Sequence, residues 1–248
     1  MRIAPSLHLV ASGGLGFDLT SAWDCNVWLA DSGDGLLLFD AGAGLDGPSL
    51  LDVVAADGLD PARITHVFLT HAHADHSGGA AALCRAIPGL SVCCGRRTAE
   101  ILAENDERLI SLDRARQAGV YPADYRWTAP PGTRALADEA EMRIGEASIR
   151  LIETPGHSDD HCAYLLRLGQ RVALLSGDSL FYDGRVLLQD IPDCSVAKTI
   201  ATVRRLAGLG FDTFLPGHGL FSLRNGMRHV ARANGYAERM LPPPQVIG

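Results

Sequence analysis

Residues 70–79 read Thr-His-Ala-His-Ala-Asp-His-Ser-Gly-Gly, and three histidines and one aspartate fall within six positions of this stretch: His71, His73, Asp75 and His76. Imidazole nitrogens bind borderline-soft divalent ions, and a carboxylate adds negative charge that can be shared between two ions. A regular helix would scatter the four side chains around its axis. A tight loop at a strand end instead lets His71 and His73 converge on one point, and Asp75 and His76 on another. The stretch therefore predicts a loop that holds two metal ions.

The overall composition indicates an acidic, globular α/β protein. The 248 residues suffice for one large domain or two small ones with a sizeable core. The net charge is -7, and Lys198 is the only lysine among the 22 basic residues. No basic run is present, so the sequence predicts no nucleic-acid partner. Short apolar runs near the N-terminus are interrupted by glycines, which predicts no signal peptide, no membrane span and a cytoplasmic location.

The cysteines do not form a metal-binding ribbon. None of the six belongs to a Cys-x-x-Cys pair, so a structural zinc site of that kind is not supported. We expect them to be small buried hydrophobic residues in a reducing compartment.

Strands and helices alternate along the first half of the chain. The apolar runs 25–30 and 36–39 flank a Gly-Asp-Gly turn and predict a hairpin. A helix is expected from near Pro48, a strand over 64–69 that ends at the histidine loop, and a helix over 78–87. Asp40 directly follows the second run of the hairpin.

A polar helical insert follows, at about residues 97–132. Charged residues dominate 97–118, and Tyr121, Tyr125 and Trp127 come after them. Two interpretations stay open: a solvated helical pair with a loop, or a wall over a substrate cleft, because aromatic side chains supply apolar contact area.

The second half of the chain repeats the alternation. Strands are expected over 147–153, 162–168, 171–176 and 213–215, and helices over 196–209 and 223–239. His157, Asp178 and His218 each lie in a glycine turn just past a predicted strand, in the segments Pro-Gly-His, Ser-Gly-Asp and Pro-Gly-His. Functional side chains commonly sit on loops at strand ends in α/β folds. Seven compatible ligands in such positions predict a metal centre rather than a coincidence.

The ordered set of Asp40, the His-x-His-x-Asp-His run, His157, Asp178 and His218 resembles the metallo-β-lactamase superfamily over almost the whole chain. The resemblance implies a single domain over 1–248 with a four-layer αββα sandwich. It also implies that one ion is bound by His71, His73 and His157. A second would be bound by Asp75, His76 and His218, with Asp178 bridging both and Asp40 orienting the ligand loop.

The resemblance implies two divalent ions, Zn²⁺ by expectation with Fe or Mn as alternatives, and a metal-bound hydroxide that attacks a carbonyl. Asp75 would orient that hydroxide, and no protein nucleophile is needed. True β-lactamases of the superfamily carry a cysteine or no acidic bridge where this chain has Asp178. As a bridging aspartate, Asp178 resembles the one found in glyoxalase II, N-acyl homoserine lactone lactonases and related thioesterases. A small-molecule thioester, lactone or ester is therefore the expected substrate.

Several alternatives remain open from the sequence. They are a β-lactam hydrolase, an oxidoreductase similar to the mononuclear iron persulfide dioxygenases, and a non-catalytic binding module. Tyr182 is a candidate for contacting the substrate oxygen, with a partly buried loop aromatic as the alternative. For His161 we expect a supporting or surface role rather than ligation. The oligomeric state is not encoded in any motif.

Overall fold

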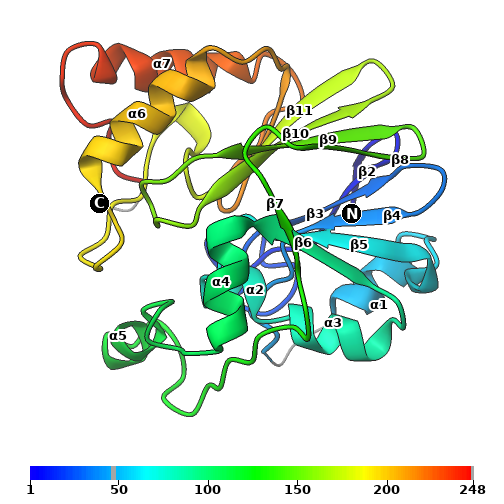
Figure 1. Ribbon diagram of the computed structural model, residues 1–248. Helices are drawn as coiled ribbons and strands as arrows, with labels where there is room; N and C mark the ends of the chain where they lie inside the picture. Colours follow the sequence, from blue (N-terminus) through cyan, green and yellow to red (C-terminus); the bar gives the residue numbers. More distant parts are fainter. Residues whose placement is uncertain (46–48, 247–248) are drawn as a thin grey trace. The chain divides into compact units, whose positions relative to one another are not determined.

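The computed structural model describes residues 1–45 and 49–246, and the chain divides into two compact units, Met1–Leu136 and Ala137–Gly248. Each unit consists of one sheet with helices, so the predicted α/β class is confirmed (Figure 1). Each unit thus supplies one β and one α layer of the four that were expected. The assignment of 1–248 to a single domain stays a prediction.

The first unit contains a seven-stranded sheet in which the strands follow in sequence order. The strands are β1 (Arg2–Ala4), β2 (Leu7–Ala11), β3 (Val27–Asp31), β4 (Leu36–Phe39), β5 (Ile64–Phe68), β6 (Ser91–Gly95) and β7 (Arg134–Leu136). Strands β1 to β4 are antiparallel, and β4 to β7 are parallel. The predicted hairpin is β3–β4. In the parallel pair β4–β5, Phe39 is opposite Phe68, which places the residues that follow both strands side by side.

Helices connect the parallel strands, as crossover connections require. They are α1 (Leu50–Ala56), the 3₁₀ turn Pro61–Arg63, α2 (Ala74–Ser77), α3 (Ala80–Ala86), α4 (Arg96–Glu104) and α5 (Leu112–Gln117). Pro48, near which a helix was expected, lies outside the described residues, and α1 begins at Leu50 after the N-cap Ser49. Apolar residues of β3 to β5 form one core with Val54, Leu83 and Ile101 of α1, α3 and α4.

The polar insert departs from a continuous helical region. α4 ends at Glu104, its C-cap Asn105 has a left-handed φ of 49°, and α5 starts only at Leu112. Asparagine tolerates this conformation at a helix C-terminus, which explains the break. Tyr125 and Trp127 are buried in the core of the first unit rather than solvated.

The second unit contains a five-stranded sheet of order β12-β11-β10-β9-β8. The strands are β8 (Glu141–Ile144), β9 (Ala147–Glu153), β10 (Cys162–Leu168), β11 (Arg171–Gly177) and β12 (Thr213–Pro216), and the helices are the 3₁₀ turn Tyr182–Gly184, α6 (Val196–Ala207) and α7 (Met227–Ala237). Only the β11–β12 pair is parallel. Both helices share a core with β9, β10 and β11 through Val203, Leu206 and Val230.

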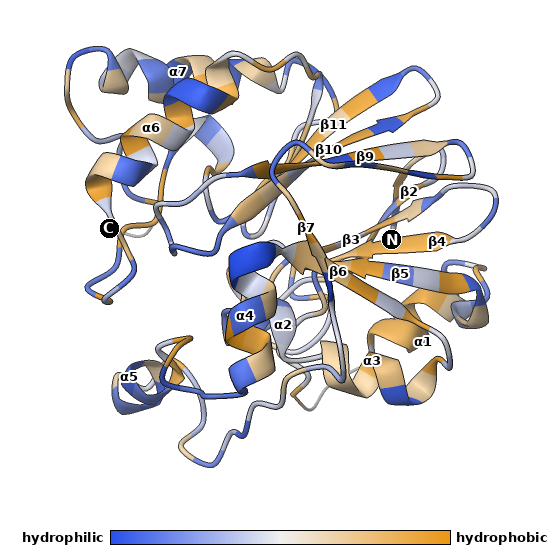
Figure 2. Ribbon diagram, in the orientation of Figure 1, coloured by the Kyte–Doolittle hydropathy of each residue, from blue (hydrophilic) through white to orange (hydrophobic). Residues whose placement is uncertain are grey.

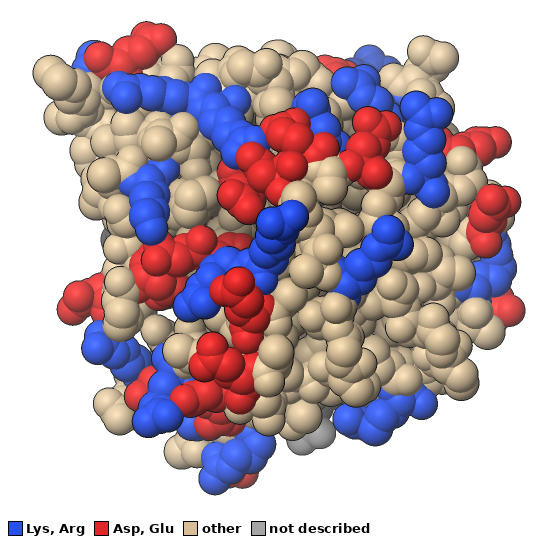
Figure 3. All heavy atoms as spheres, viewed as in Figure 1, with Lys and Arg blue, Asp and Glu red and all other residues tan. Residues whose placement is uncertain are grey.

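The distribution of hydrophobic and hydrophilic residues is typical of sheets packed against helices within each unit. In Figure 2 the strands of both sheets are mostly hydrophobic, whereas α4 and α6 alternate hydrophobic and hydrophilic residues. This alternation is typical of helices that bury one face. On the face shown in Figure 3, acidic and basic side chains are interspersed. No helix among residues 1–45 and 49–246 has the length and apolar character needed to cross a membrane.

Candidate metal centre

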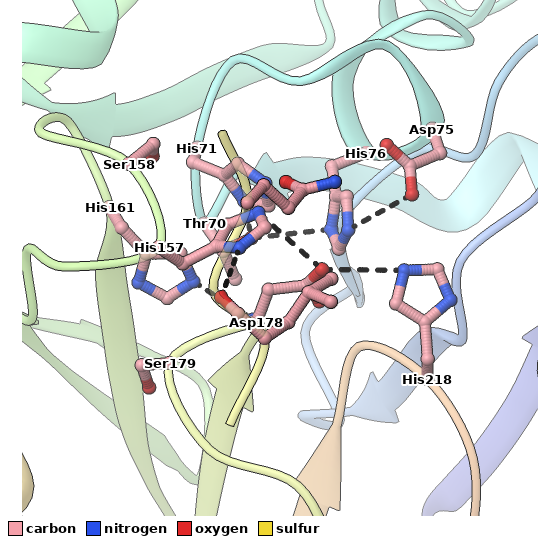
Figure 4. A network of polar contacts seen from close by, with 12 residues as sticks. Thr70, His71, Asp75, His76, His157, Ser158, His161, Asp178, Ser179 and His218 are labelled. Carbon is pink, nitrogen blue, oxygen red and sulfur yellow. Dashed lines mark hydrogen bonds and ion pairs between the residues drawn. The ribbon is translucent and has the colours of Figure 1, made fainter. Parts of the chain in front are cut away.

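The histidine loop, residues 70–79 and called the ligand loop below, follows β5 directly and carries potential metal ligands. His71 and His76 are fully buried, and His73 and Asp75 are partly exposed. The ring centroid of His71 lies 4.6 Å from that of His73 and 4.1 Å from that of His76. Asp75 Oδ2 lies 3.5 Å from His76 Nε2 (Figure 4). Four potential ligands of the first unit are therefore concentrated beside one strand end.

The prediction that all four ligands lie in a non-helical loop is partly wrong. His71 and His73 lie in a loop, but Asp75 and His76 belong to the one-turn helix α2, for which His73 is the N-cap residue. A single turn is too short to scatter side chains around its axis. The helix therefore keeps Asp75 and His76 next to the two loop histidines.

Asp40 orients His76 and the start of the ligand loop. Its Oδ2 lies 2.8 Å from His76 Nδ1, and its Oδ1 accepts a hydrogen bond from the Thr70 backbone N–H at 2.7 Å. With its proton on Nδ1, the His76 ring donates to the carboxylate and presents Nε2 on its other side. Asp40 has a φ of 65°, a left-handed conformation that aspartate tolerates better than most residues.

Thr70 has a similar role for His71, and the sequence analysis did not identify it. Its hydroxyl lies 3.0 Å from Asp40 Oδ2 and 2.9 Å from His71 Nδ1. A hydroxyl that donates to the carboxylate accepts from the imidazole N–H, so Nε2 is again the ring atom available for a ligand. The only sequence feature that could have indicated this role is the position of Thr70 directly before His71.

Cys25 is the third member of a compact group with Asp40 and His76, whose potential ligand atoms all lie within 4.8 Å of one another. Its backbone N–H donates to the Asp75 carbonyl at 3.3 Å. Burial raises the pKa of the Cys25 thiol to about 12, against a weaker opposing effect of His76. The thiol is therefore protonated at neutral pH, in agreement with the expected buried, hydrophobic role.

The second unit brings His157, Asp178 and His218 together at one end of its sheet. Asp178 follows β11 and His218 follows the parallel strand β12, while His157 lies in the connection from β9 to β10. Asp178 Oδ2 lies 3.7 Å from His157 Nε2 and 3.5 Å from His218 Nε2 (Figure 4). His157 Nδ1 lies 3.2 Å from the Leu187 carbonyl oxygen and donates to it, so Nε2 is directed at the carboxylate.

His161 fixes the backbone of Asp178 rather than pointing to solvent. Its Nε2 accepts a hydrogen bond from the Asp178 N–H at 2.9 Å, and its Nδ1 lies 2.8 Å from Thr154 Oγ1. The ring is 1% exposed. An Nε2 that accepts from an amide carries no proton, so Nδ1 donates to Thr154. Of the two expected roles, the structure supports the internal one.

Gly156 allows the His157 loop to approach α6. A Cβ atom at Gly156 would lie 2.7 Å from the backbone N of Thr199, and the residue has a φ of 148°. Only glycine combines this conformation with such a close approach.

Tyr182 contacts α7. Its ring centroid lies 4.5 Å from that of His229, and its hydroxyl accepts a hydrogen bond from Arg228 at 2.8 Å. The Arg228 guanidinium also lies 5.4 Å from the centre of the Tyr182 ring. A catalytic role for Tyr182 stays a prediction.

The fold and the donor atoms define a class of protein: a two-sheet α/β protein with buried His and Asp clusters suited to divalent metal ions. The family model of the metallo-β-lactamase superfamily matches residues 20–218. The chain belongs to this superfamily, and the predicted resemblance is confirmed.

Curated relatives of the chain include two fungal proteins. The lactamase-like protein vrtG of Penicillium aethiopicum is 28% identical over 220 residues, covering 88% of this chain and 58% of the relative. An atrochrysone carboxyl ACP thioesterase of Aspergillus fumigatus is 28% identical over 195 residues, covering 78% of this chain and 50% of the relative. The chain thus spans about half the length of these relatives.

Solved structures support the same fold. A mutant metallo-β-lactamase with a HARLDQ motif from Cronobacter sakazakii superposes with a TM-score of 0.71 at 19% identity, covering 97% of this chain and 93% of the other. A B3 metallo-β-lactamase with an active-site glutamic acid has a TM-score of 0.68 at 26% identity, covering 96% of this chain and 85% of the other. The expected metallo-β-lactamase type of fold is therefore confirmed.

Proposed function

We propose that this protein is a dinuclear metal-dependent hydrolase that cleaves a carbonyl–heteroatom bond in a small-molecule thioester, lactone or ester. One observation carries the proposal: His157 and His218 both direct Nε2 at the same oxygen of Asp178. A carboxylate held between two imidazoles is suited to bridging two ions, each of which takes one of the histidines. In the proposed centre His71, His73 and His157 would hold one ion, Asp75, His76 and His218 would hold the other, and Asp178 would be shared by both.

The donor atoms fit divalent metal ions. They are imidazole nitrogens and carboxylate oxygens, the ligand set preferred by Zn²⁺ and also accepted by Fe and Mn. In His71, His76 and His157 a hydrogen bond from Nδ1 fixes the ring and assigns Nε2 to the ligand role. Such supporting bonds are typical of metal-ligating histidines.

When bound, two divalent ions supply a water activated near neutral pH and a polarised carbonyl. The protein residues provide orientation. Asp75, in α2, would accept a hydrogen bond from that water and orient it. Asp40 and Thr70 hold His76 and His71, and His161 holds the backbone of Asp178. Tyr182 accepts from Arg228, so its own proton can be donated to a substrate oxygen.

A thioester is our preferred substrate class. Four of the relatives carry thioesterase names, and they are 24–28% identical to this chain.

Hydrolysis of β-lactams is a second candidate, supported by the B3 metallo-β-lactamase structure at 26% identity. The aspartate at position 178 argues against it, because the resemblance associates an acidic bridge with thioester and lactone hydrolysis.

The test is a hydrolysis panel on protein of known metal content, with acyl and aryl thioesters, S-lactoylglutathione, a lactone series and a β-lactam reporter. We expect thioester or lactone turnover that falls at least about 100-fold in Asp178→Asn, because the bridge between the ions is weakened. Asp159→Asn is the matched control, since Asp159 is exposed and pairs with Lys198 at 2.6 Å. Unchanged turnover in a folded Asp178→Asn protein would refute the dinuclear mechanism. One bound iron with oxygen consumption would favour the oxidoreductase alternative.

A further inference from the structure

Residues 121–127, which we call the aromatic strap, contact the ligand loop 70–79 at several points although they contain none of the proposed metal ligands. Trp127 is 5% exposed, and its Nε1 donates to Ser77 Oγ at 2.9 Å. Ser77 Oγ in turn donates to the Ala72 carbonyl at 2.8 Å. Ala72 lies between His71 and His73 in the chain. The indole is thus connected through one hydroxyl to the backbone between two proposed ligands.

Tyr125 of the strap contacts the C-terminal end of the ligand loop. Tyr125 donates its hydroxyl proton to the Ala43 carbonyl at 2.6 Å. The same hydroxyl lies so close to Gly78 that a Cβ atom at Gly78 would collide with it. The Tyr125 hydroxyl is therefore packed against the ligand loop just after α2.

Tyr121 packs against the ring of Tyr125, and the two ring centroids lie 5.3 Å apart. This contact helps to hold Tyr125 in the position in which its hydroxyl meets the end of the ligand loop.

The strap is itself held rigidly by charged groups. Arg116 donates to Glu107 at 2.6 Å and to the Tyr125 carbonyl at 2.7 Å, and Glu107 accepts from the Trp127 N–H at 3.0 Å. Charge-assisted hydrogen bonds of this kind are short and strong. The insert therefore has a fixed attachment from which to position the ligand loop.

We propose that the aromatic strap is a positioning device for the metal centre, in which Trp127 fixes the loop between His71 and His73 through Ser77 and Tyr125 holds the end of the same loop at Gly78. The inference rests on the proposed function for its catalytic meaning. The strap occupies only part of the insert at about 97–132, so this role stands beside the two interpretations of that insert, a solvated helical pair or a wall over a substrate cleft, and both stay predictions.

The first experiment measures metal affinity by chelator competition and the Co²⁺ absorption spectrum of the full chain. We expect Tyr125→Phe to weaken metal binding by about 10-fold, as for other groups that support a ligand, because the hydroxyl that meets Gly78 and donates to the Ala43 carbonyl is lost. The Co²⁺ ligand-field bands should shift. Tyr236→Phe is the matched control, because Tyr236 lies on α7 in the second unit. Affinities and spectra equal to those of wild type would overturn the role of Tyr125.

The second experiment is a double-mutant cycle with Trp127→Phe and Ser77→Ala, read by hydrogen exchange of residues 70–79 in metal-free protein. Each single change should raise exchange of the loop amides about 10-fold, and the double change should add little, because both remove the same hydrogen bond. Additive effects, or no effect in folded variants, would overturn the role of Trp127. This readout needs no metal. If the variants lose loop protection but the wild-type protein binds no ions, the proposed function is refuted while the role of the strap in holding the loop is retained.

Discussion

At the scale of single residues, the candidate centre depends on a small set of polar groups that hold the histidine rings. Asp40 is 2% exposed and contacts both His76 and Thr70. Thr70 extends that contact to His71. One carboxylate therefore influences two proposed ligands, although it binds no ion in the proposed centre.

Replacing Asp40 tests this dependence. Asp40→Asn keeps the shape but removes the charge that retains the proton on His76 Nδ1, so we expect metal affinity to fall about 10–100-fold. Chelator competition measures the affinity, and Asp34→Asn, at an exposed aspartate, is the control. An affinity within 2-fold of wild type would show that Asp40 does not orient the ligands.

The residues that bind metal in our proposal were all named from the sequence, because their spacing and the family resemblance specify them. The supporting residues were named only in part. Asp40 was named, and a supporting role was one of two expectations for His161. Thr70 and Ser77 were not identified, because their roles depend on which side chains the fold places opposite them. Hydrogen bonds between distant positions cannot be deduced from local spacing.

At the scale of elements, the site depends on strand ends that the sheets place next to each other. The parallel pair β4–β5 brings Asp40 beside the ligand loop, and the parallel pair β11–β12 brings Asp178 near His218. Close backbone approach between the loops is equally important: a Cβ atom at Gly79, the N-cap of α3, would collide with the Ala41 carbonyl.

Alanine at two glycines tests this packing. Gly79→Ala should destabilise the protein by about 1–3 kcal/mol, because the added methyl meets backbone that cannot move aside. Gly210→Ala has open space around its Cβ position and should be neutral or stabilising by up to about 1 kcal/mol. Urea unfolding measures both free energies. Equal effects of the two substitutions would contradict the close approach.

The strongly patterned elements were predicted to within a few residues, and the weakly patterned ones were missed. The β9 and β10 ranges, 147–153 and 162–168, agree with the structure because long apolar or alternating runs specify them. Strands β7 and β8 were not predicted, since they have only three and four residues and are largely exposed. The one-turn helix α2 is likewise too short for any periodicity to reveal it.

At the scale of the whole molecule, one buried histidine outside the candidate centre affects stability as pH changes. His229 is 1% exposed, and its Nδ1 accepts a hydrogen bond from the Asp183 N–H at 2.9 Å. Burial, with a smaller contribution from the charge of Arg228, lowers the pKa of His229 from 6.5 to about 4. The folded protein therefore holds this ring neutral.

The sign of the pH effect follows from that shift. Between pH 6.5 and 4 the unfolded chain takes up a proton at His229 and the folded chain does not. The stabilisation is complete above pH 6.5 and is lost as the pH falls towards 4, by on the order of 3 kcal/mol at most. His229→Gln should lose less stability than wild type over this range, as measured by urea unfolding at several pH values. Parallel pH profiles would contradict the assignment.

The central claim is that this chain binds two divalent ions, and the most direct measurement is metal stoichiometry. Protein stripped with a chelator would be reconstituted with Zn²⁺, freed of excess ions and analysed for metal per chain by elemental analysis. Two equivalents are predicted for wild type, in agreement with two histidines that face one oxygen of Asp178. A folded wild-type protein that retains one equivalent or none would contradict the dinuclear centre.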